Sequence, residues 1–364
     1  MKVDNWTRGI FTVIFLIDLV SLQGTGIFHI TQDTVKQETP AIYENIVVWE
    51  DWRNVKPFSG LNLDIYGYDL LTGKEFQVTT DPEIQEFPAI YGNIVVWEDN
   101  RNGNEDIYGY DLGIQEEFQI TEDLSFQSYP RIYGNIVVWE DWRNGKADIY
   151  GYDLVGKEEF QITVNPKNQS YPAIYGEIVV WDDHRNGDED IYGYNLVAQK
   201  EFQITSNSKR QCMPAIFGDI VVWQDNRNGN WDIYGYNLST KEEFPIIKNP
   251  GDQVWPQICG DIIVWTNLGI ERLDVCGYNL STGEEFLMGV GKEAVIYEEY
   301  IVWTSQEDII GCNLHELQHT TPPDSTPPET TPPDSTPFSV IVLLGALIGI
   351  LVILYSFIRK KKIG

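Results

Sequence analysis

The stretch "IVVWEDNRNGNEDIYGYDL", residues 94–112, decides the fold, because close copies begin at residues 46, 136, 178 and 220 and divergent ones at 262 and 301. A fixed period of about 42 residues is typical of four-stranded propeller blades. The β-branched and aromatic content, separated by Gly and Asn, favours strands over helical repeats. The tryptophans that mark the seven copies are Trp49, Trp97, Trp139, Trp181, Trp223, Trp265 and Trp303.

Each copy predicts one blade. The Asn102-Gly103 pair suits a type I′ hairpin, which places Trp97 opposite Tyr108. Gly109 in the middle of a strand would weaken an isolated sheet, so it predicts close packing against another blade. The four strands expected in the second copy are residues 88–91, 94–99, 106–112 and 117–121.

The N-terminus supplies a strand that has no blade of its own. Phe28 in "IFHIT" lies 21 residues before Trp49, the spacing that separates most fourth-strand phenylalanines from the next tryptophan. The seventh copy lacks a clear fourth strand, since "HELQHT" follows Leu314 too soon. We therefore expect an all-β, seven-bladed β-propeller over residues 27–317, closed by the N-terminal strand, because closure removes exposed sheet edges.

The two ends of the chain predict export and membrane attachment. Residues 1–26 have the basic start and apolar stretch of a signal peptide, which is either cleaved or kept as an N-terminal anchor. Residues 318–337 form a Thr/Pro-rich stalk, and residues 338–358 carry no charge and predict one transmembrane helix. The basic residues of 359–364 predict a cytoplasmic tail, which makes the protein a single-pass protein of the cell membrane with the propeller outside the cell.

Charge and cysteine content restrict the partners. The formal net charge is −30, so the surface repels nucleic acid and attracts cations or basic partners. Four cysteines are too few for a disulfide framework, and a single disulfide is left open. The oligomeric state is not predicted. Three sequons are glycosylation candidates if the protein is exported: Asn168, Asn237 and Asn279.

The repeat "P-x-I-x-G-[ND]-I-V-V-W-x-D-x-R-N-G-x-x-D-I-Y-G-Y-[DN]-L…E-F-Q-I-T" resembles the TolB-type, WD-like propeller repeat. In particular it looks like the version on archaeal cell-surface proteins, where the blades accompany an S-layer or membrane anchor. The resemblance covers residues 27–314 and implies the fold. It says little about function, because propellers host binding proteins and enzymes alike. The usual "SPDG" turn is reduced to "YGN", which argues against equivalence to the bacterial periplasmic protein.

Opposed carboxylates recur in the hairpins, where Asp99 faces Asp106 across the two strands. We expect Arg101, on the same face, to bridge both as a structural ion cluster. In the sixth copy Arg272 takes a cross-strand place beside Asp274. Calcium, which needs six to eight oxygen ligands, is the alternative, and no other cofactor or metal is expected. The predicted ion-cluster residues are Asp99, Arg101, Asp106, Asp141, Arg143, Asp148, Arg272 and Asp274.

Two sets of residues are candidates for ligand binding. The first decorates the hairpin tips on one face, where aromatic rings either anchor a glycan or protein or pack into adjacent grooves; it comprises Trp52, Trp142, His184 and Trp231. The second is a recurring glutamine near the channel mouth, which either binds a ligand or satisfies backbone groups in a loop; it comprises Gln37, Gln85, Gln127, Gln169, Gln211 and Gln253.

Catalysis finds little support in the sequence. The chain has four histidines without metal-ligand spacing, and no nucleophile or zinc motif. No catalytic residue is expected, and the main expectation is a non-catalytic binding or structural module for envelope protein or glycan. The alternative is an extracellular carbohydrate-active enzyme, a glycosidase or lyase, that uses the channel mouth. Acidic side chains unique to one or two blades and converging in a pocket would favour that enzyme.

Overall fold

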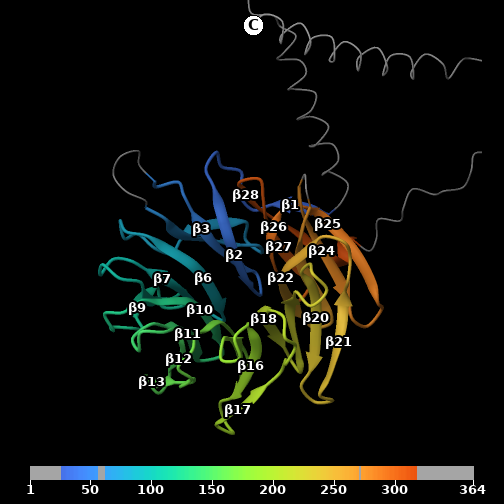
Figure 1. Cartoon of the computed structure of the whole chain (residues 1–364). Helices are drawn as coiled ribbons and strands as arrows, with labels where there is room; N and C mark the ends of the chain where they lie inside the picture. The colour runs from blue at the N-terminus through green and yellow to red at the C-terminus, as the bar shows by residue number, and fades with distance from the viewer. Residues whose placement is uncertain (1–25, 56–61, 270–271, 318–364) are drawn as a thin grey trace, which may run out of the picture. The chain divides into compact units, whose positions relative to one another are not determined.

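The computed structural model describes residues 26–55, 62–269 and 272–317, which form seven antiparallel four-stranded sheets arranged as blades around a ring (Figure 1). The expectation of an all-β, seven-bladed propeller is confirmed. The first blade consists of β2 (Gln37–Tyr43), β3 (Ile46–Asp51), β4 (Asp64–Asp69) and β5 (Lys74–Gln77). In each of the first six blades the first strand is innermost in the ring, and the last lies at the periphery (Figure 1).

The other complete blades repeat this order. The second is β6 (Gln85–Tyr91), β7 (Ile94–Asp99), β8 (Asp106–Asp111) and β9 (Glu116–Gln119), and the third is β10 (Gln127–Tyr133), β11 (Ile136–Asp141), β12 (Asp148–Asp153) and β13 (Glu158–Gln161). The fourth is β14 (Gln169–Tyr175), β15 (Ile178–Asp183), β16 (Asp190–Asn195) and β17 (Lys200–Gln203). The fifth is β18 (Gln211–Phe217), β19 (Ile220–Asp225), β20 (Asp232–Asn237) and β21 (Glu242–Ile247). The sixth is β22 (Asp252–Cys259), β23 (Ile262–Leu268), β24 (Leu273–Asn279) and β25 (Glu284–Val290).

The seventh blade closes the ring with a strand from the other end of the propeller. Its three C-terminal strands are β26 (Lys292–Tyr297), β27 (Tyr300–Ser305) and β28 (Asp308–Asn313). β1 (Ile27–His29) pairs antiparallel with β28, and Phe28 lies opposite Gly311. The predicted N-terminal closure is therefore present. A single helical turn, α2 (Leu314–Leu317), follows β28 where the sequence offered only a doubtful strand.

The tryptophan of each copy is the centre of the packing between blades. Trp97 is fully buried, lies opposite Tyr108 as predicted, and donates its indole N–H to Asp99 Oδ2 over 2.9 Å. Val96 of the same strand packs in the next interface along the ring, beside Trp139. Both faces of the middle strands are thus buried, which is why the copies do not alternate strictly between apolar and polar residues.

The hairpin turn differs from the expected type I′ turn, although the register is the one predicted. Gly103 has a φ of +89°, but Asn102 keeps a negative φ, and Gly103 N donates to Asn100 O over 3.0 Å. Asn102 is held instead by its side chain, which donates to Asp106 Oδ2 over 2.7 Å. The side chain therefore fixes the turn, and the type I′ prediction is wrong.

Glycine is required in the middle of the third strand for a reason other than the expected one. A Cβ at Gly109 would lie 2.6 Å from Cζ of Phe118, its neighbour on the next strand of the same blade. The phenyl ring covers the glycine, so the expected packing against another blade is wrong. The pair recurs in other blades, as in Gly67 and Phe76.

The predicted signal segment, stalk, transmembrane helix and basic tail lie outside the described residues. Within the described part of the chain, no helix is long and apolar enough to span a membrane. Cys212, Cys259 and Cys276 are buried thiols with no disulfide, in line with their place on strands.

Candidate active site

The hairpin arginines neutralise one of the two opposed aspartates, not both. Arg101 binds Asp99 through Nη2 over 2.6 Å and Glu117 of β9 through Nη1 over 2.5 Å. Asp106 accepts from the Asn102 amide instead. The expectation that arginine bridges two aspartates is therefore corrected: the ion pair runs outward to the fourth strand. Arg143 pairs likewise with Asp141 and Glu159, and the Asn144 amide binds Asp148.

The sixth blade keeps only an exposed remnant of this arrangement. Arg272 pairs with Asp274 over 2.9 Å, and 58% of its side-chain surface is exposed. Among the described residues, no group of three or more His, Cys, Asp or Glu side chains is arranged to hold a metal ion. A bound calcium ion stays a prediction.

The rim candidates occupy separate hairpins. Trp142 is 39% exposed, whereas Trp52 lies under Lys36, with Nζ 4.7 Å from the ring centroid. Trp231 lies beside Arg210, whose guanidinium carbon is 5.4 Å from the ring centroid, and His184 is half-buried. Two of the three indoles are therefore partly covered by a cationic side chain of a neighbouring segment. Binding at this rim stays a prediction, as does glycosylation of the sequons.

The recurring glutamines are not exposed at the channel mouth. Gln85 and Gln127 are fully buried, and their amide nitrogens donate to backbone oxygens two residues earlier, Glu83 O over 2.7 Å and Ser125 O over 2.5 Å. These bonds close the loops that enter β6 and β10. A ligand in the channel cannot reach them, so their expected place at the mouth is corrected.

A bulge interrupts each inner strand near its first residues. In β6 the register shifts between Glu86 and Ala89, and Phe87 adopts a φ of +51°. The bulge turns the N–H of Phe87 away from its own sheet, where Glu50 of the preceding blade accepts it over 2.8 Å. The same left-handed position recurs in every inner strand, at Thr39, Phe87, Tyr129, Tyr171, Met213, Trp255 and Glu293.

The acids that accept these N–H groups are buried between blades. Burial raises the pKa of Glu50 and Glu140 to about 7, and it raises the pKa of Glu98 and Asp182 well above the ordinary range. The fifth blade uses a neutral side chain instead, since Gln224 accepts from Trp255 N over 3.0 Å. An amide therefore suffices for this structural bond.

Three consecutive bulges carry aromatic rings that form an arc. The centroids of Phe87 and Tyr129 are 4.8 Å apart, and those of Tyr129 and Tyr171 are 4.9 Å apart. Each ring comes from a different blade, so the arc follows the ring of inner strands. Aromatic faces of this kind provide apolar surface with a polar edge, on which the apolar face of a sugar can stack.

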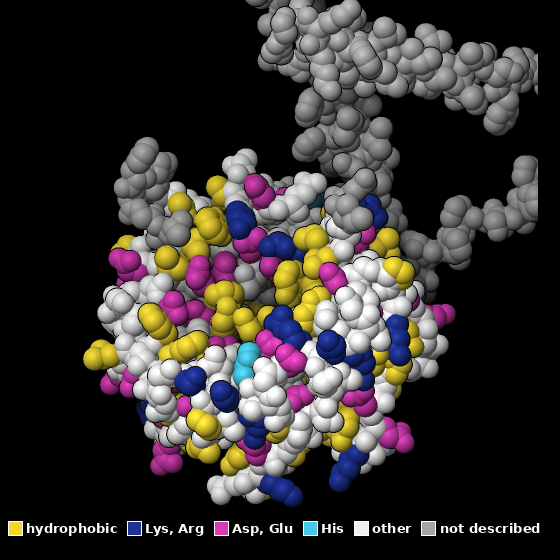
Figure 2. All heavy atoms as spheres, viewed as in Figure 1, with side chains coloured by type: hydrophobic (Ala, Val, Ile, Leu, Met, Phe, Trp, Pro, Cys, Tyr) yellow, Lys and Arg dark blue, Asp and Glu magenta, His cyan; other side chains and the backbone are white. Residues whose placement is uncertain are grey.

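Carboxylates lie next to the bulge on the inner strands of the first, second and seventh blades. Glu38 and Glu86 each follow the buried glutamine, and no other blade has an acid at that position. Lys292 Nζ binds Glu38 Oε1 over 2.7 Å and Glu293 Oε1 over 2.9 Å, and Lys36 also pairs with Glu38. On the face drawn in Figure 2, acidic and basic side chains lie close together around a hydrophobic centre.

The two unique glutamates differ in their electrostatics. Burial alone would raise the pKa of Glu38, but hydrogen bonds from Lys292 and Lys36 outweigh it and hold that pKa below its usual value. Burial raises the pKa of Glu86, and the charge of Glu105 raises it further. One carboxyl is thus kept ionised while the other is biased toward its protonated form, which is the division of roles that acid–base catalysis requires.

Sequence analysis missed this cluster because the bulge was not foreseen. The signal was present at one position of the repeat. The residue after the glutamine is Glu38, Glu86, Ser128, Ser170, Cys212 or Val254, and the equivalent residue of the seventh blade, after Gly291, is Lys292. The other positions of the repeat are nearly constant, so variation at this one indicates that its side chain does not pack against the next blade.

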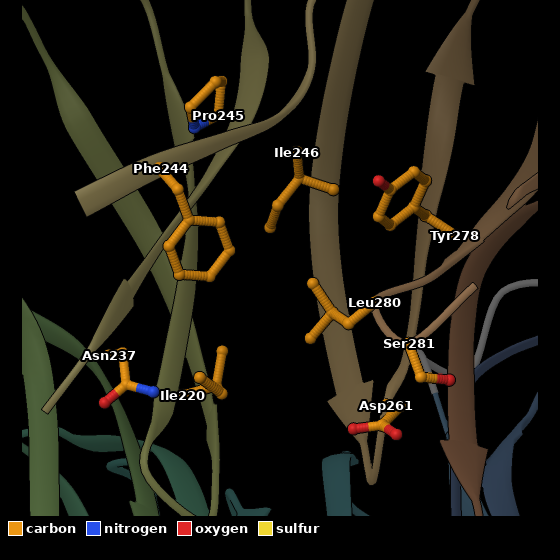
Figure 3. A pocket seen from close by; sticks show the side chains of 9 residues that line it. All are labelled: Ile220, Asn237, Phe244, Pro245, Ile246, Asp261, Tyr278, Leu280 and Ser281. Carbon is orange, nitrogen blue, oxygen red and sulfur yellow. The ribbon is translucent and has the colours of Figure 1, made fainter. Parts of the chain in front are cut away.

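A cavity of about 420 Å³ lies between the fifth and sixth blades (Figure 3). Its wall is mixed, with apolar side chains such as Phe244 and Leu280 beside the polar Asn237. Asp261 is its one carboxylate. It does not offer paired ionisable groups, and the channel mouth is the better candidate for catalysis.

Comparisons with known proteins support the fold. No model of a protein family matches the chain, and neither does any curated protein. Among solved structures, a putative TolB from Agrobacterium tumefaciens is 16% identical with a TM-score of 0.51, covering 67% of this chain and 95% of that one. An oligogalacturonate lyase from Vibrio parahaemolyticus is 13% identical with a TM-score of 0.59, covering 79% and 93%. The acylaminoacyl peptidase of Pyrococcus horikoshii is 13% identical with a TM-score of 0.59, covering 74% and 48%.

The fold is that of a TolB-like seven-bladed propeller. The comparisons leave the resemblance to archaeal cell-surface proteins as a prediction. They contradict the main functional expectation, a non-catalytic module, because lyases and peptidases stand among the similar structures beside TolB. At 12–16% identity these likenesses show the fold and no particular activity.

Proposed function

We propose that this protein is a carbohydrate-active enzyme that cleaves glycosidic bonds at the channel mouth. The observation that carries the proposal is that Glu38 and Glu86 occupy the same inner-strand position, beside the bulge, in two adjacent blades and that no other blade has an acid there. Their pKa values are also shifted in opposite directions. Acids confined to one or two blades are the feature that separates an enzyme from a binding module in this fold. The predicted signal segment and transmembrane helix support a substrate in the cell envelope.

The two glutamates have complementary parts in this reaction. Glu86, biased toward its protonated form, donates a proton to the glycosidic oxygen as the bond breaks. Glu38, kept ionised by Lys292, stabilises the positive charge that develops on the sugar ring and directs the attack of water. The aromatic arc that begins at Phe87 supports the ring of a neighbouring sugar.

The test measures cleavage of a panel of polysaccharides by the full-length chain. New reducing ends report hydrolysis, and the ultraviolet absorbance of an unsaturated product reports elimination, the other reaction open to this site. We expect the variants Glu38→Ser and Glu86→Ser to lose activity by about 10²-fold or more, since general acid–base groups contribute about 10²–10⁴-fold.

Serine is a conservative replacement here because it occupies the same position in the third and fourth blades, as Ser128 and Ser170. The matched control is Glu116→Ser, at an exposed position on β9. Activity that survives in both mouth variants, or a wild-type chain that cleaves no polysaccharide, would overturn the proposal.

A further inference from the structure

A single arginine stands on an inner strand at a position where other blades have small or neutral residues. Arg131 lies in the middle of β10, one residue after the proline that follows the bulge. A long cationic side chain there is not needed to build a blade, since six other blades form without it. The equivalent residues are Ala41, Ala89, Ala173, Ala215, Gln257 and Val295.

Arg131 differs from the other arginines of the described residues in lacking an ion pair. The hairpin arginines bind aspartate at 2.6–2.7 Å, and Arg210 and Arg272 also pair with acids. The Arg131 guanidinium makes one hydrogen bond, from Nη1 to the backbone oxygen of Pro130 over 2.9 Å. Most of its five N–H donors therefore have no acceptor among the described residues.

Protein surrounds the guanidinium of Arg131. Burial lowers its pKa, while its side chain remains partly exposed. β10, which carries Arg131, is the innermost strand of the third blade (Figure 1). Because the side chain keeps some solvent exposure, an anion can reach the unused donors.

The nearby acids do not take the place of such an anion. Glu98 and Glu140 raise the pKa of Arg131 through their charge, but neither comes within ion-pairing distance. Each already accepts a backbone N–H over 2.6 Å, from Tyr129 and Tyr171. Burial raises the pKa of both acids, which lessens their negative charge near neutral pH.

We propose that Arg131 binds the carboxylate of the substrate, so that the enzyme acts on a glycan that contains a sugar acid. The inference rests on the proposed function and names its substrate class. A carboxylate meets the planar guanidinium through two parallel hydrogen bonds, while Tyr129 and Tyr171 offer their rings to the sugar. A net charge of −30 repels a densely charged polyuronate, so the substrate carries acidic sugars among neutral ones.

The test is calorimetric titration of the full-length chain with glucuronate and, as the matched neutral ligand, glucose. We expect glucuronate to bind at least about tenfold more tightly than glucose, the value of one charge-assisted pair. Arg131→Ala abolishes this preference. Arg131→Lys retains part of it, because lysine keeps the positive charge but cannot make two parallel hydrogen bonds to the carboxylate. Alanine is native at the equivalent position of four blades, and thermal unfolding of the variant checks that it folds.

The outcomes separate this inference from the proposed function. Binding is measured again in Glu38→Ser, where cleavage is lost but the preference for glucuronate is retained if Arg131 is the anchor. Retained preference in a chain that cleaves nothing supports the anchor and refutes the enzyme. Equal binding of glucose and glucuronate, tighter binding of glucose 6-sulfate, or an unchanged preference in Arg131→Ala overturns the inference.

Discussion

Replacing one buried acid between blades with its amide should stabilise the protein above about pH 4.5, with the full effect reached above about pH 7. Glu140 is 4% exposed and accepts the N–H of Tyr171, and its pKa is raised from 4.5 to about 7. That shift corresponds to about 3 kcal/mol, since one pKa unit is worth about 1.4 kcal/mol. The fifth blade shows that the amide of Gln224 makes the equivalent bond, so Glu140→Gln keeps the contact and removes the charge.

The sign follows from proton binding. Between pH 4.5 and about 7 the folded state holds the Glu140 proton more tightly than the unfolded chain, so the wild type loses stability as pH rises through that window. The variant lacks this loss. At pH 8 we expect Glu140→Gln to exceed the wild type by up to about 3 kcal/mol in free energy of unfolding, and at pH 4 to match it.

Urea denaturation of the full-length chain, followed by fluorescence of the buried tryptophans, measures this difference at each pH. The reciprocal variant Gln224→Glu serves as the control, since it introduces the same buried acid in the fifth blade and should destabilise at pH 8. A difference between Glu140→Gln and the wild type that does not change with pH would refute the reasoning.

Three further variants test the packing. Gly109→Ala places a Cβ 2.6 Å from the Phe118 ring and should cost about 1–3 kcal/mol in unfolding free energy, less in a Phe118→Ala background; an equal cost in both would contradict the contact. Phe28→Ala removes the ring that covers Gly311 in the closing strand pair. It should cost about 2 kcal/mol or more in unfolding free energy and so lower the melting temperature by several degrees. An unchanged melting temperature argues against closure by β1. Arg101→Lys loses the two-bond contact with fully buried Asp99 and should cost about 1 kcal/mol by urea denaturation, and no loss would show that the pair is inert.

The blade and its register were predictable because they depend on local pattern. The 42-residue period fixes one blade per copy, and the spacing from Phe28 to Trp49 identifies the closing strand. Details that depend on side-chain competition were not. Asn102 bonds Asp106 with its amide instead of entering a left-handed turn, and Arg101 selects Glu117 over the second aspartate.

The candidate site was largely hidden for a different reason. The inner-strand bulge shifts the register by an irregular step, so the period-two pattern no longer tells which side chains face the channel. Glu86 and Arg131 stand on either side of that irregularity in their strands. Both residues differ from those at the equivalent positions of most other inner strands, and only this comparison distinguishes them.

The junction between the seventh and first blades has a consequence for biogenesis. Lys292 and Glu38 touch across 254 positions of sequence, next to the place where β1 and β28 join the termini of the propeller. A ribosome releases Glu38 long before Lys292 is made. The contact that lowers the pKa of Glu38 therefore cannot form in a nascent chain, and any activity that depends on it would begin only after synthesis of the last blade is complete.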